Sequence, residues 1–290
     1  MSARLRAAAL AAFLTGLIGW VGVSDAGGAS FLKRAIATLS KQGIASSKYL
    51  TSDPAKLHQL NVSWAYDWSW RRPPLHTRGV QWVPMVWGAG AVTRQVITAL
   101  TADRERGRAT YLLGFNEPDD AEQSNMTPVQ AADLWPWLES TGLQLGAPAP
   151  AVPDDGWLAH FMRLARARHL RIDFLTVHVY QDFTNPKAIG QLKRLLVSLN
   201  AKYHLPIWVT EIGTINLRAR GIYMEHAPTY ARAKHYMQAV TALLNSLPFV
   251  ERYAWFTDDG WDTPAWRVSS LFDGRNRLTR MGQAYAQDVG

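Results

Sequence analysis

The chain has 290 residues, 48% of them hydrophobic and 19% charged, which supplies a large core and excludes a largely disordered protein. The absence of cysteine excludes disulfides, thiolate metal sites and a cysteine nucleophile. The net charge of +8 favours anionic surfaces, but the densest basic run, at 163–171, is typical of a solvated helix face and lacks interleaved aromatic residues. We therefore expect no nucleic-acid partner.

The N-terminal segment has the pattern of a secretory signal. Basic residues precede an apolar run over 7–23, and the small residues Ser24 and Ala26 follow it. We expect cleavage of 1–26, which would leave 27–290 as a mature protein that is extracellular, periplasmic or associated with the cell envelope. An uncleaved membrane anchor is the alternative, because the apolar run is long, although its three glycines weigh against a stable span. No other segment could cross a membrane, so we expect no stable insertion after cleavage.

Short apolar, β-branched or aromatic runs recur along the rest of the chain, with helical patterns between them. The predicted strands are 42–47, 60–66, 80–87, 109–115, 143–149, 172–180, 206–212 and 250–256. The segments with apolar residues at helical spacing are 91–103, 155–169, 187–202, 228–246 and 279–287. The segment 69–79 is poor in helix signals, and we expect a loop there.

Three positions carry signals for the start of a helix. Thr127 and Gln130 form a predicted capping box, with Pro128 at the first helical position. Asp53 and Asn185, each followed by a proline, indicate the same kind of start.

Eight strands that alternate with helices indicate an α/β protein with a parallel sheet and crossover helices. Their number predicts closure into a single-domain (β/α)₈ TIM barrel, and about 264 mature residues is a typical size for that fold. An open doubly wound sheet is the alternative. It would need a glycine-rich phosphate loop after the first strand, and neither of the usual patterns is present.

Two predicted strands end in a carboxylate. Glu117 follows the fourth strand and Glu211 ends the seventh, and in this type of barrel the chemistry gathers at such ends. Two carboxylates beside one small site are what glycosidic bond cleavage needs, one as proton donor and one ionised. Asn116 could bond the sugar 2-hydroxyl. Taken alone, the run from Asn116 to Asp120 is also a reasonable polar turn, with Asp119 or Asp120 capping a helix.

Alternation along the seventh strand predicts which way its side chains point. It places Ile207, Val209 and Glu211 on one face. Trp208 would then lie on the other face, towards the helices, and we interpret it as a core residue.

Aromatic residues and one histidine gather at the predicted strand ends. Alternation places three sets of side chains each on one face: Trp64, Tyr66 and Trp68; His178 and Tyr180; Tyr253 and Trp255. For each aromatic residue core packing is the alternative to stacking on a sugar. The residues that we expect to contact substrate are Tyr66, Trp87, His178, Tyr180 and Trp255, and His178 could instead hydrogen-bond the nucleophile.

The motifs "LLGFNEPD", "VPMVWG", "DFLTVHVY", "PIWVTEIG" and "RYAWF", in this order, resemble glycoside hydrolase family 128. These are β-1,3-glucanases in a clan of retaining (β/α)₈ hydrolases, and the resemblance runs from about residue 43 to the end. It implies that Glu117 is the acid/base and Glu211 the nucleophile of a double displacement. The two carboxyl groups would then lie roughly 5–5.5 Å apart.

One position departs from the family pattern. The family has Tyr-Asn-Trp at the end of the second strand, and this chain has Asp67 in place of the asparagine. An extra carboxylate there could contact substrate or change the pKa of the acid. The histidines show no metal spacing and no G-x-S-x-G elbow is present, so we expect no metal, no cofactor and no serine hydrolase chemistry.

The sequence therefore predicts a secreted, monomeric endo-β-1,3-glucanase that acts on a β-glucan. A hydrolase or transglycosylase for another envelope polysaccharide is a second hypothesis, which Asp67 and the basic surface keep open. A catalytically silent carbohydrate-binding barrel is the third, and the pair of carboxylates weighs against it.

Overall fold

The computed structural model describes residues 40–46, 53–73, 79–153, 156–215, 227–257 and 267–287. They belong to one compact unit, Leu39–Gly290. The predicted signal segment, 1–26, lies outside the described residues. Within the described part of the chain, no helix combines the length and the apolar character that crossing a membrane requires.

Strands and helices alternate along this unit, as the sequence predicts. The strands are β1 (Gln42–Ala45), β2 (Trp64–Tyr66), β3 (Gln81–Trp82), β4 (Tyr111–Leu113), β5 (Gln144–Gly146), β6 (Leu175–Asp182), β7 (Ile207–Ile215) and β8 (Val250–Trp255). The helices are α3 (Pro54–Gln59), the 3₁₀ turn η1 (Ala89–Ala91), α4 (Arg94–Glu105), α5 (Pro128–Glu139), α6 (Trp157–Ala167), α7 (Ala188–Tyr203), α8 (Ala227–Ser246) and α9 (Arg280–Gln287). Each predicted strand and helical segment overlaps one of these elements.

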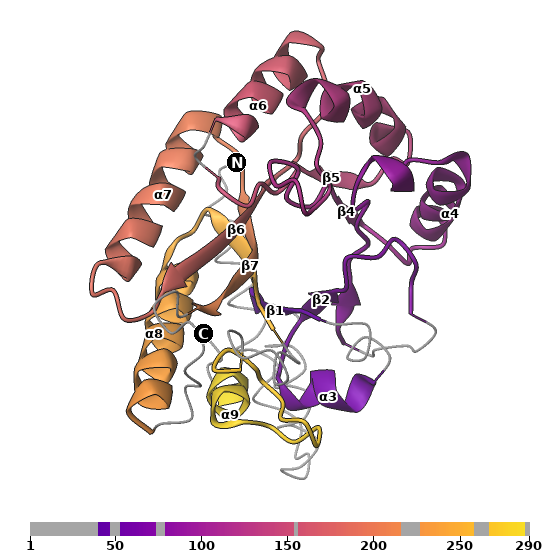
Figure 1. The fold of residues 1–290 in the computed structure, drawn as a ribbon. Helices are drawn as coiled ribbons and strands as arrows, with labels where there is room; N and C mark the ends of the chain where they lie inside the picture. Colours follow the sequence, from indigo (N-terminus) through magenta and orange to yellow (C-terminus); the bar gives the residue numbers. More distant parts are fainter. Residues whose placement is uncertain are drawn as a thin grey trace, which may run out of the picture. The chain divides into compact units, whose positions relative to one another are not determined.

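The strands pair in parallel and in a cyclic order. Six form a sheet in the order β3-β2-β1-β8-β7-β6, and β4 pairs with β5. Parallel bridges from Met85 to Leu113 and from Gly146 to Phe174 continue the order from β3 to β4 and from β5 to β6. The helices lie on the outer side of the strands (Figure 1). This is the strand order of a (β/α)₈ fold, and it brings the carboxyl ends of all the strands to one side.

Local signals account for two of the three predicted helix starts. Thr127 and Gln130 form the capping box of α5, with proline at its first position. The Asp53 side chain accepts a hydrogen bond from Ala55 N at the start of α3. The third start differs, because α7 begins at Ala188 without a side-chain cap. Asn185 instead closes a turn before the helix, where its Oδ1 accepts a hydrogen bond from Lys187 N.

Side chains of the strands divide between two cores. Alternate residues of β6 and β7, among them Val177 and Val209, pack against the helices. The opposite residues form an inner cluster of Ala45, Trp64, Tyr66, Val83, Met85, Leu113, Phe174, Trp208 and Ala254. Trp208 is thus a core residue, but the expectation that it faces the helices is wrong. Its ring stacks on Phe174 at 4.2 Å inside the ring of strands.

The amino ends of the strands are filled by an aromatic layer around one arginine. The Arg252 guanidinium lies over the rings of Trp208, Tyr111 and Trp64, at 4.3, 4.7 and 5.6 Å from their centres. Its Nη2 donates to Gln81 Oε1 at 2.6 Å. Cation–π contacts compensate part of the cost of burying this charge. The layer closes the interior on the side opposite the carboxyl ends.

Candidate active site

A bulge in β7 directs Glu211 into the interior. Val209 pairs with Val177 on β6, but the next pair along is Glu211 with His178, so β7 contains one extra residue at Thr210. The extra residue reverses the alternation beyond Val209. Ile207 and Val209 face the helices, whereas Glu211 faces inward. The prediction that these three side chains share a face is therefore wrong, although Glu211 reaches the predicted strand end.

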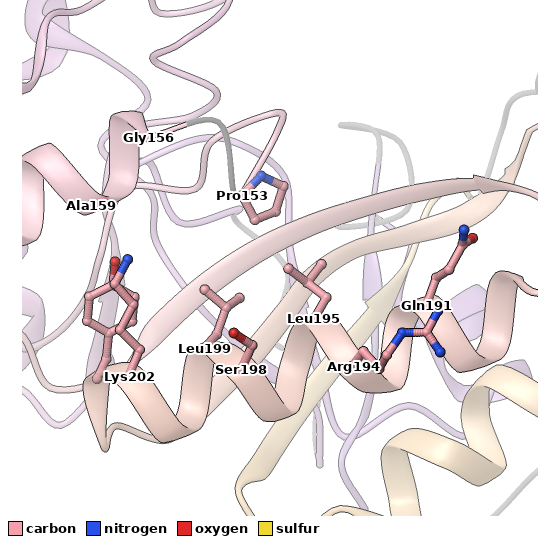
Figure 2. A pocket seen from close by; sticks show the side chains of 10 residues that line it. Pro153, Gly156, Ala159, Gln191, Arg194, Leu195, Ser198, Leu199 and Lys202 are labelled. Atoms are coloured by element: carbon pink, nitrogen blue, oxygen red, sulfur yellow. The ribbon is translucent and has the colours of Figure 1, made fainter.

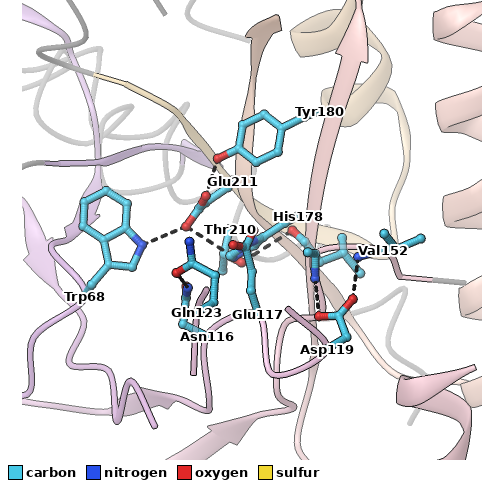
Figure 3. Close-up of polar contacts among 12 residues, drawn as sticks. Trp68, Asn116, Glu117, Asp119, Gln123, Val152, His178, Tyr180, Thr210 and Glu211 are labelled. Carbon is cyan, nitrogen blue, oxygen red and sulfur yellow. Dashed lines mark hydrogen bonds and ion pairs between the residues drawn. The ribbon is translucent and has the colours of Figure 1, made fainter. Parts of the chain in front are cut away.

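Three donors hold the Glu211 carboxylate, and Figure 3 labels two of them, Trp68 and Tyr180. Its Oε1 accepts from Tyr66 Oη at 2.9 Å and from Trp68 Nε1 at 2.8 Å. Its Oε2 accepts from Tyr180 Oη. Glu211 is 5% exposed, so these bonds replace most of the water that an exposed carboxylate would bind. Together the three donors fix the orientation of the carboxylate.

Glu117 is placed by the loop that follows β4. Its backbone is left-handed, with φ of 40°, and its N–H donates to Ala149 O at 2.8 Å. The Asp119 carboxylate accepts from Ala151 N at 2.7 Å and from Val152 N at 3.0 Å. The loop after β4 is thus fixed to the loop after β5. This clamp holds a strained residue in one orientation.

His178 lies between the two carboxylates. Its Nδ1 is 2.9 Å from Glu117 Oε1 and its Nε2 is 3.5 Å from Glu211 Oε1, and the side chain is fully buried. Burial by itself lowers the pKa of the imidazole. The negative charge of Glu211, together with the hydrogen bond and the charge of Glu117, outweighs burial, so the pKa of His178 is raised. His178 therefore tends to be cationic and to link the two acids.

The two tyrosines at Glu211 remain proton donors. Burial, then the charge of Glu211 and the hydrogen bond to it, raise the pKa of Tyr66 well above its ordinary value. The same causes raise the pKa of Tyr180 well above its ordinary value. Both hydroxyls therefore stay protonated at neutral pH and donate to the carboxylate.

A cavity of about 340 Å³ opens over these groups. Its lining residues are Trp68, Trp87, Asn116, Glu117, Gln123, Tyr180, Glu211 and Phe256. Trp87 is 38% exposed and offers a ring at the rim. Asn116 is buried, and its Nδ2 donates to Gln123 Oε1 at 3.3 Å. Within the described residues the Asn116 Oδ1 has no hydrogen-bond partner, so it is available to a ligand hydroxyl.

Comparisons with known proteins agree with this geometry. The chain matches the family model described as glycosyl hydrolase catalytic core over residues 43–285. A subgroup I endo-β-1,3-glucanase of glycoside hydrolase family 128 from Amycolatopsis mediterranei, solved with laminaritriose, is 36% identical, with a TM-score of 0.74. That match covers 86% of this chain and 99% of the other. The chain belongs to glycoside hydrolase family 128.

Two other matches extend the comparison. A subgroup III curdlan-specific exo-β-1,3-glucanase of family 128 from Blastomyces gilchristii, solved with glucose, is 29% identical with a TM-score of 0.66, covering 85% of this chain and 97% of that one. Alkali-sensitive linkage protein 1 of Schizosaccharomyces pombe is 34% identical over 160 residues. That alignment covers 52% of this chain and 27% of the relative, so the chain spans about a quarter of the relative's length. As a family 128 member the protein is a glycosidase.

Two predicted contact residues of this family 128 glycosidase lie away from the cavity. Trp255 is completely buried on the helix-facing side of β8, and its Nε1 donates to Ser269 O at 2.9 Å. Asp67 accepts from Trp82 Nε1 at 3.1 Å and is not among the residues that line the cavity. Tyr66 and His178 are at the site but contact the carboxylates beneath the cavity. Asn116, Trp87 and Tyr180 line the cavity, and their contact with substrate stays a prediction.

Sequence reasoning missed three lining residues, namely Trp68, Gln123 and Phe256. Alternation places Trp68 on the inward face with Tyr66, and a tryptophan there is a signal for a site role. Phe256 directly follows β8, and the pattern there favours its neighbour Trp255. Gln123 lies in the polar turn after Glu117, and nothing in its local pattern distinguishes it.

Glu117, His178 and Glu211 also have the spacing of a metal site. One potential ligand atom from each lies within 4.8 Å of the others. Each of the three already contacts at least one of the others. The absence of a metal and of a cofactor stays a prediction.

A larger cavity of about 480 Å³ lies elsewhere, between α6 and α7 (Figure 2). Its described lining contains Arg194 and Lys202 and no carboxylate. Acid-catalysed glycosyl transfer needs a proton donor and a second carboxylate, so the smaller cavity at the strand ends is the candidate active site.

Proposed function

We propose that this family 128 glycosidase is a retaining endo-β-1,3-glucanase, with Glu117 as acid/base and Glu211 as nucleophile. The observation that carries the proposal is the convergence of the two carboxylates in one cavity, with an oxygen of each within 4.8 Å of the other. Retaining enzymes place the carboxyl groups about 5–5.5 Å apart, and inverting enzymes about 6.5–9.5 Å. The short separation supports retention.

The first step would be attack on the anomeric carbon. A Glu211 oxygen forms a bond to that carbon as the glycosidic bond breaks, and the leaving oxygen takes the proton of Glu117. In the second step water attacks the same carbon and gives its proton to Glu117, and the bond to Glu211 breaks. His178 contacts both carboxylates. Its positive charge would stabilise each of them while Glu117 gives up and regains its proton.

The substrate assignment rests on the relatives and on the cavity. The Amycolatopsis mediterranei endo-β-1,3-glucanase was solved with laminaritriose, and a variant of it with laminarihexaose. Identity is higher to this endo-acting relative, at 36%, than to the exo-acting one, at 29%. Trp68, Trp87 and Phe256 give the cavity the aromatic surfaces that stack on glucose rings.

Location is proposed from the N-terminal pattern alone. We propose that the protein is secreted after removal of 1–26, and that it acts outside the cytoplasm on a β-glucan. Mass spectrometry of the protein recovered from the culture medium or envelope fraction tests this. A mature N-terminus near residue 27 is expected, and recovery of the intact chain in the membrane fraction would contradict it.

Reducing-sugar release from a linear β-1,3-glucan tests the activity. We expect wild type to be active and Glu117→Gln and Glu211→Gln each to lose on the order of 10³-fold or more in kcat, since each removes one step's essential group. Glu105→Gln, an exposed change on α4, is the matched control and should keep full activity. Proton NMR of the first-formed product should show the β-anomer, and an α-anomer would overturn retention.

A panel of other glucans tests the second hypothesis. Release from β-1,4- or mixed-linked glucan in preference to the β-1,3-glucan, by the folded wild-type protein, would sink the substrate assignment. Activity that survived in both Glu117→Gln and Glu211→Gln would show that the active site lies elsewhere in the protein.

A further inference from the structure

The two oxygens of the Glu211 carboxylate face different surroundings. Oε1 accepts from Tyr66 and from Trp68 and lies 3.5 Å from His178 Nε2. Oε2 accepts from Tyr180. A carboxylate oxygen has about two lone-pair sites. Two donors therefore occupy Oε1, while the donors found among the described residues leave one lone pair on Oε2.

The surroundings of the two oxygens also differ in burial. Tyr66 and His178, two of the three groups beside Oε1, are completely buried and do not line the cavity, whereas Trp68, the third, lines it. Tyr180, which bonds Oε2, does line the cavity. Oε1 is therefore flanked by two groups of the protein interior, whereas the one donor to Oε2 found among the described residues lines the substrate space.

From these contacts we infer that Oε2 is the attacking oxygen and that Trp68 is a positioning residue which, with Tyr66, holds Oε1 as the non-attacking oxygen. The inference rests on the proposed nucleophile role of Glu211. As the Oε2–carbon bond forms and the glycosidic bond breaks, Oε1 becomes the carbonyl oxygen of the ester. As that ester bond later breaks, negative charge returns to the carboxylate, and the bonds from Trp68 and Tyr66 strengthen in the transition state.

Trp68 is suited to this task by its fixed orientation. Its ring meets Tyr66 edge-on at 5.3 Å and Phe256 edge-on at 5.9 Å. Its backbone is left-handed, with φ of 57°, which is uncommon for a bulky residue and marks a site constraint. The indole N–H does not ionise, so it donates at every working pH.

Kinetics of two donor variants test the role of Trp68. Trp68→Phe removes the N–H and keeps an aromatic ring, and Tyr66→Phe removes the other donor to Oε1. We expect each to lower kcat on laminarihexaose by about 10- to 100-fold, the loss typical of one hydrogen bond to a charged group, with a much smaller change in KM. Trp255→Phe is the matched control, because it removes an indole donor from a backbone carbonyl outside the site, and its kcat should be unchanged.

The attacking oxygen is identified by trapping the ester. Glu117→Gln would be soaked with 2-deoxy-2-fluoro-β-laminaribiosyl fluoride, whose fluoride leaves without acid assistance, and the crystal structure determined. We expect an ester through the oxygen beside Tyr180, with the other oxygen still bonded to Trp68 and Tyr66. An ester through the oxygen that Trp68 and Tyr66 contact would overturn the inference and leave the nucleophile role intact.

Other outcomes distinguish the proposed nucleophile role of Glu211 from the positioning role of Trp68. Labelling of a residue other than Glu211 would overturn the proposed function and the inference together. Wild-type kcat in folded Trp68→Phe would overturn the positioning role. If Trp68→Phe does not fold, Tyr66→Phe decides the same question, because it is isosteric and acts on the same oxygen.

Discussion

At the scale of single residues, His178 controls how charge is shared in the site. The imidazole has no contact with solvent and lies within 3.5 Å of both carboxylates. A neutral imidazole would offer a proton to only one of its neighbours, whereas the cation can donate to both. Because its pKa is raised, the cation persists above the ordinary value of 6.5.

This shift predicts a pH-dependent loss of stability in His178→Asn. A raised pKa means that the folded state binds the proton more tightly, so the stabilisation is fully present below about pH 6.5 and is lost as pH rises through the raised pKa. We expect the variant to lose about 3–5 kcal/mol of unfolding free energy at pH 6, the usual cost of breaking a buried pair, and less at pH 9. Urea unfolding across this range measures it.

His235→Asn, an exposed change on α8, is the control and should show no such slope. A difference between wild type and His178→Asn that stays constant from pH 6 to pH 9 would mean that the buried imidazole is not cationic in the folded protein.

Two tryptophans show what a residue pattern predicts and what it does not. Alternation correctly places Tyr253 and Trp255 on one face of β8, but it does not say whether that face meets the interior or the helices. Both faces of a barrel strand are buried, so hydrophobicity does not distinguish them. Trp87 is recognisable from sequence because it ends the predicted strand 80–87.

Substitution of the two tryptophans should have opposite effects. Trp255→Phe leaves Ser269 O without its indole donor, so we expect a loss of about 1–3 kcal/mol in unfolding free energy with KM unchanged. Trp87→Ala removes an exposed ring at the cavity, so we expect KM to rise about tenfold, or about 1.4 kcal/mol, with stability unchanged. Urea unfolding and Michaelis–Menten kinetics on laminarihexaose measure both. A raised KM in Trp255→Phe would contradict this assignment and show that Trp255 contributes to substrate binding.

At the scale of elements, one inserted residue decides where Glu211, the proposed nucleophile, points. Strict alternation is right for β2 and β6, where Tyr66, His178 and Tyr180 all point inward. It fails on β7 at Thr210, because a bulge adds a residue without leaving a signature in hydrophobicity. The strand, its end and its carboxylate are predictable from sequence, but the direction of the side chain depends on pairing with β6 and β8.

The clamp between the loops after β4 and β5 predicts a selective defect in Asp119→Asn. The amide accepts fewer hydrogen bonds than the carboxylate, so the loop that holds Glu117 loses part of its support. We expect kcat on laminarihexaose to fall about tenfold, because a misplaced acid protonates the leaving oxygen poorly. Aryl β-laminaribiosides with activated leaving groups need little acid assistance and should be nearly unaffected.

Asp120→Asn is the matched control, since Asp120 lies in the same turn but accepts from Glu122 N within it. Equal losses on natural and activated substrates in Asp119→Asn would show that the clamp affects binding or folding in general and not the acid.

At the scale of the whole molecule, the order of the elements was the most predictable property. Eight strands and their helices follow from periodicity, because burial against a neighbour on each face imposes the same pattern on every unit. The meeting of Tyr66, His178 and Glu211 was not predictable from spacing, since these residues are far apart in the chain and only the cyclic strand order brings them together.

The compact unit Leu39–Gly290 contains every catalytic residue proposed here, which predicts that it folds and works alone. A chain that begins at Leu39 should match the chain that begins at residue 27 in far-UV circular dichroism, in the urea midpoint and in kcat on laminarihexaose. A lower midpoint or lost activity in the shorter chain would show that 27–38 contributes to the fold.

The aromatic layer around Arg252 has a consequence for the fate of the proposed glycosyl-enzyme. Because that layer fills the amino ends of the strands, donor, water and released oligosaccharide all reach Glu211 through the same opening. A leaving oligosaccharide that has not yet departed occupies the path of the incoming water. Attack by the hydroxyl that has just left re-forms the original chain, whereas attack by a hydroxyl of another substrate molecule that enters through the same opening gives a longer chain. Concentrated substrate should therefore yield longer chains by transfer, and dilution should restore hydrolysis.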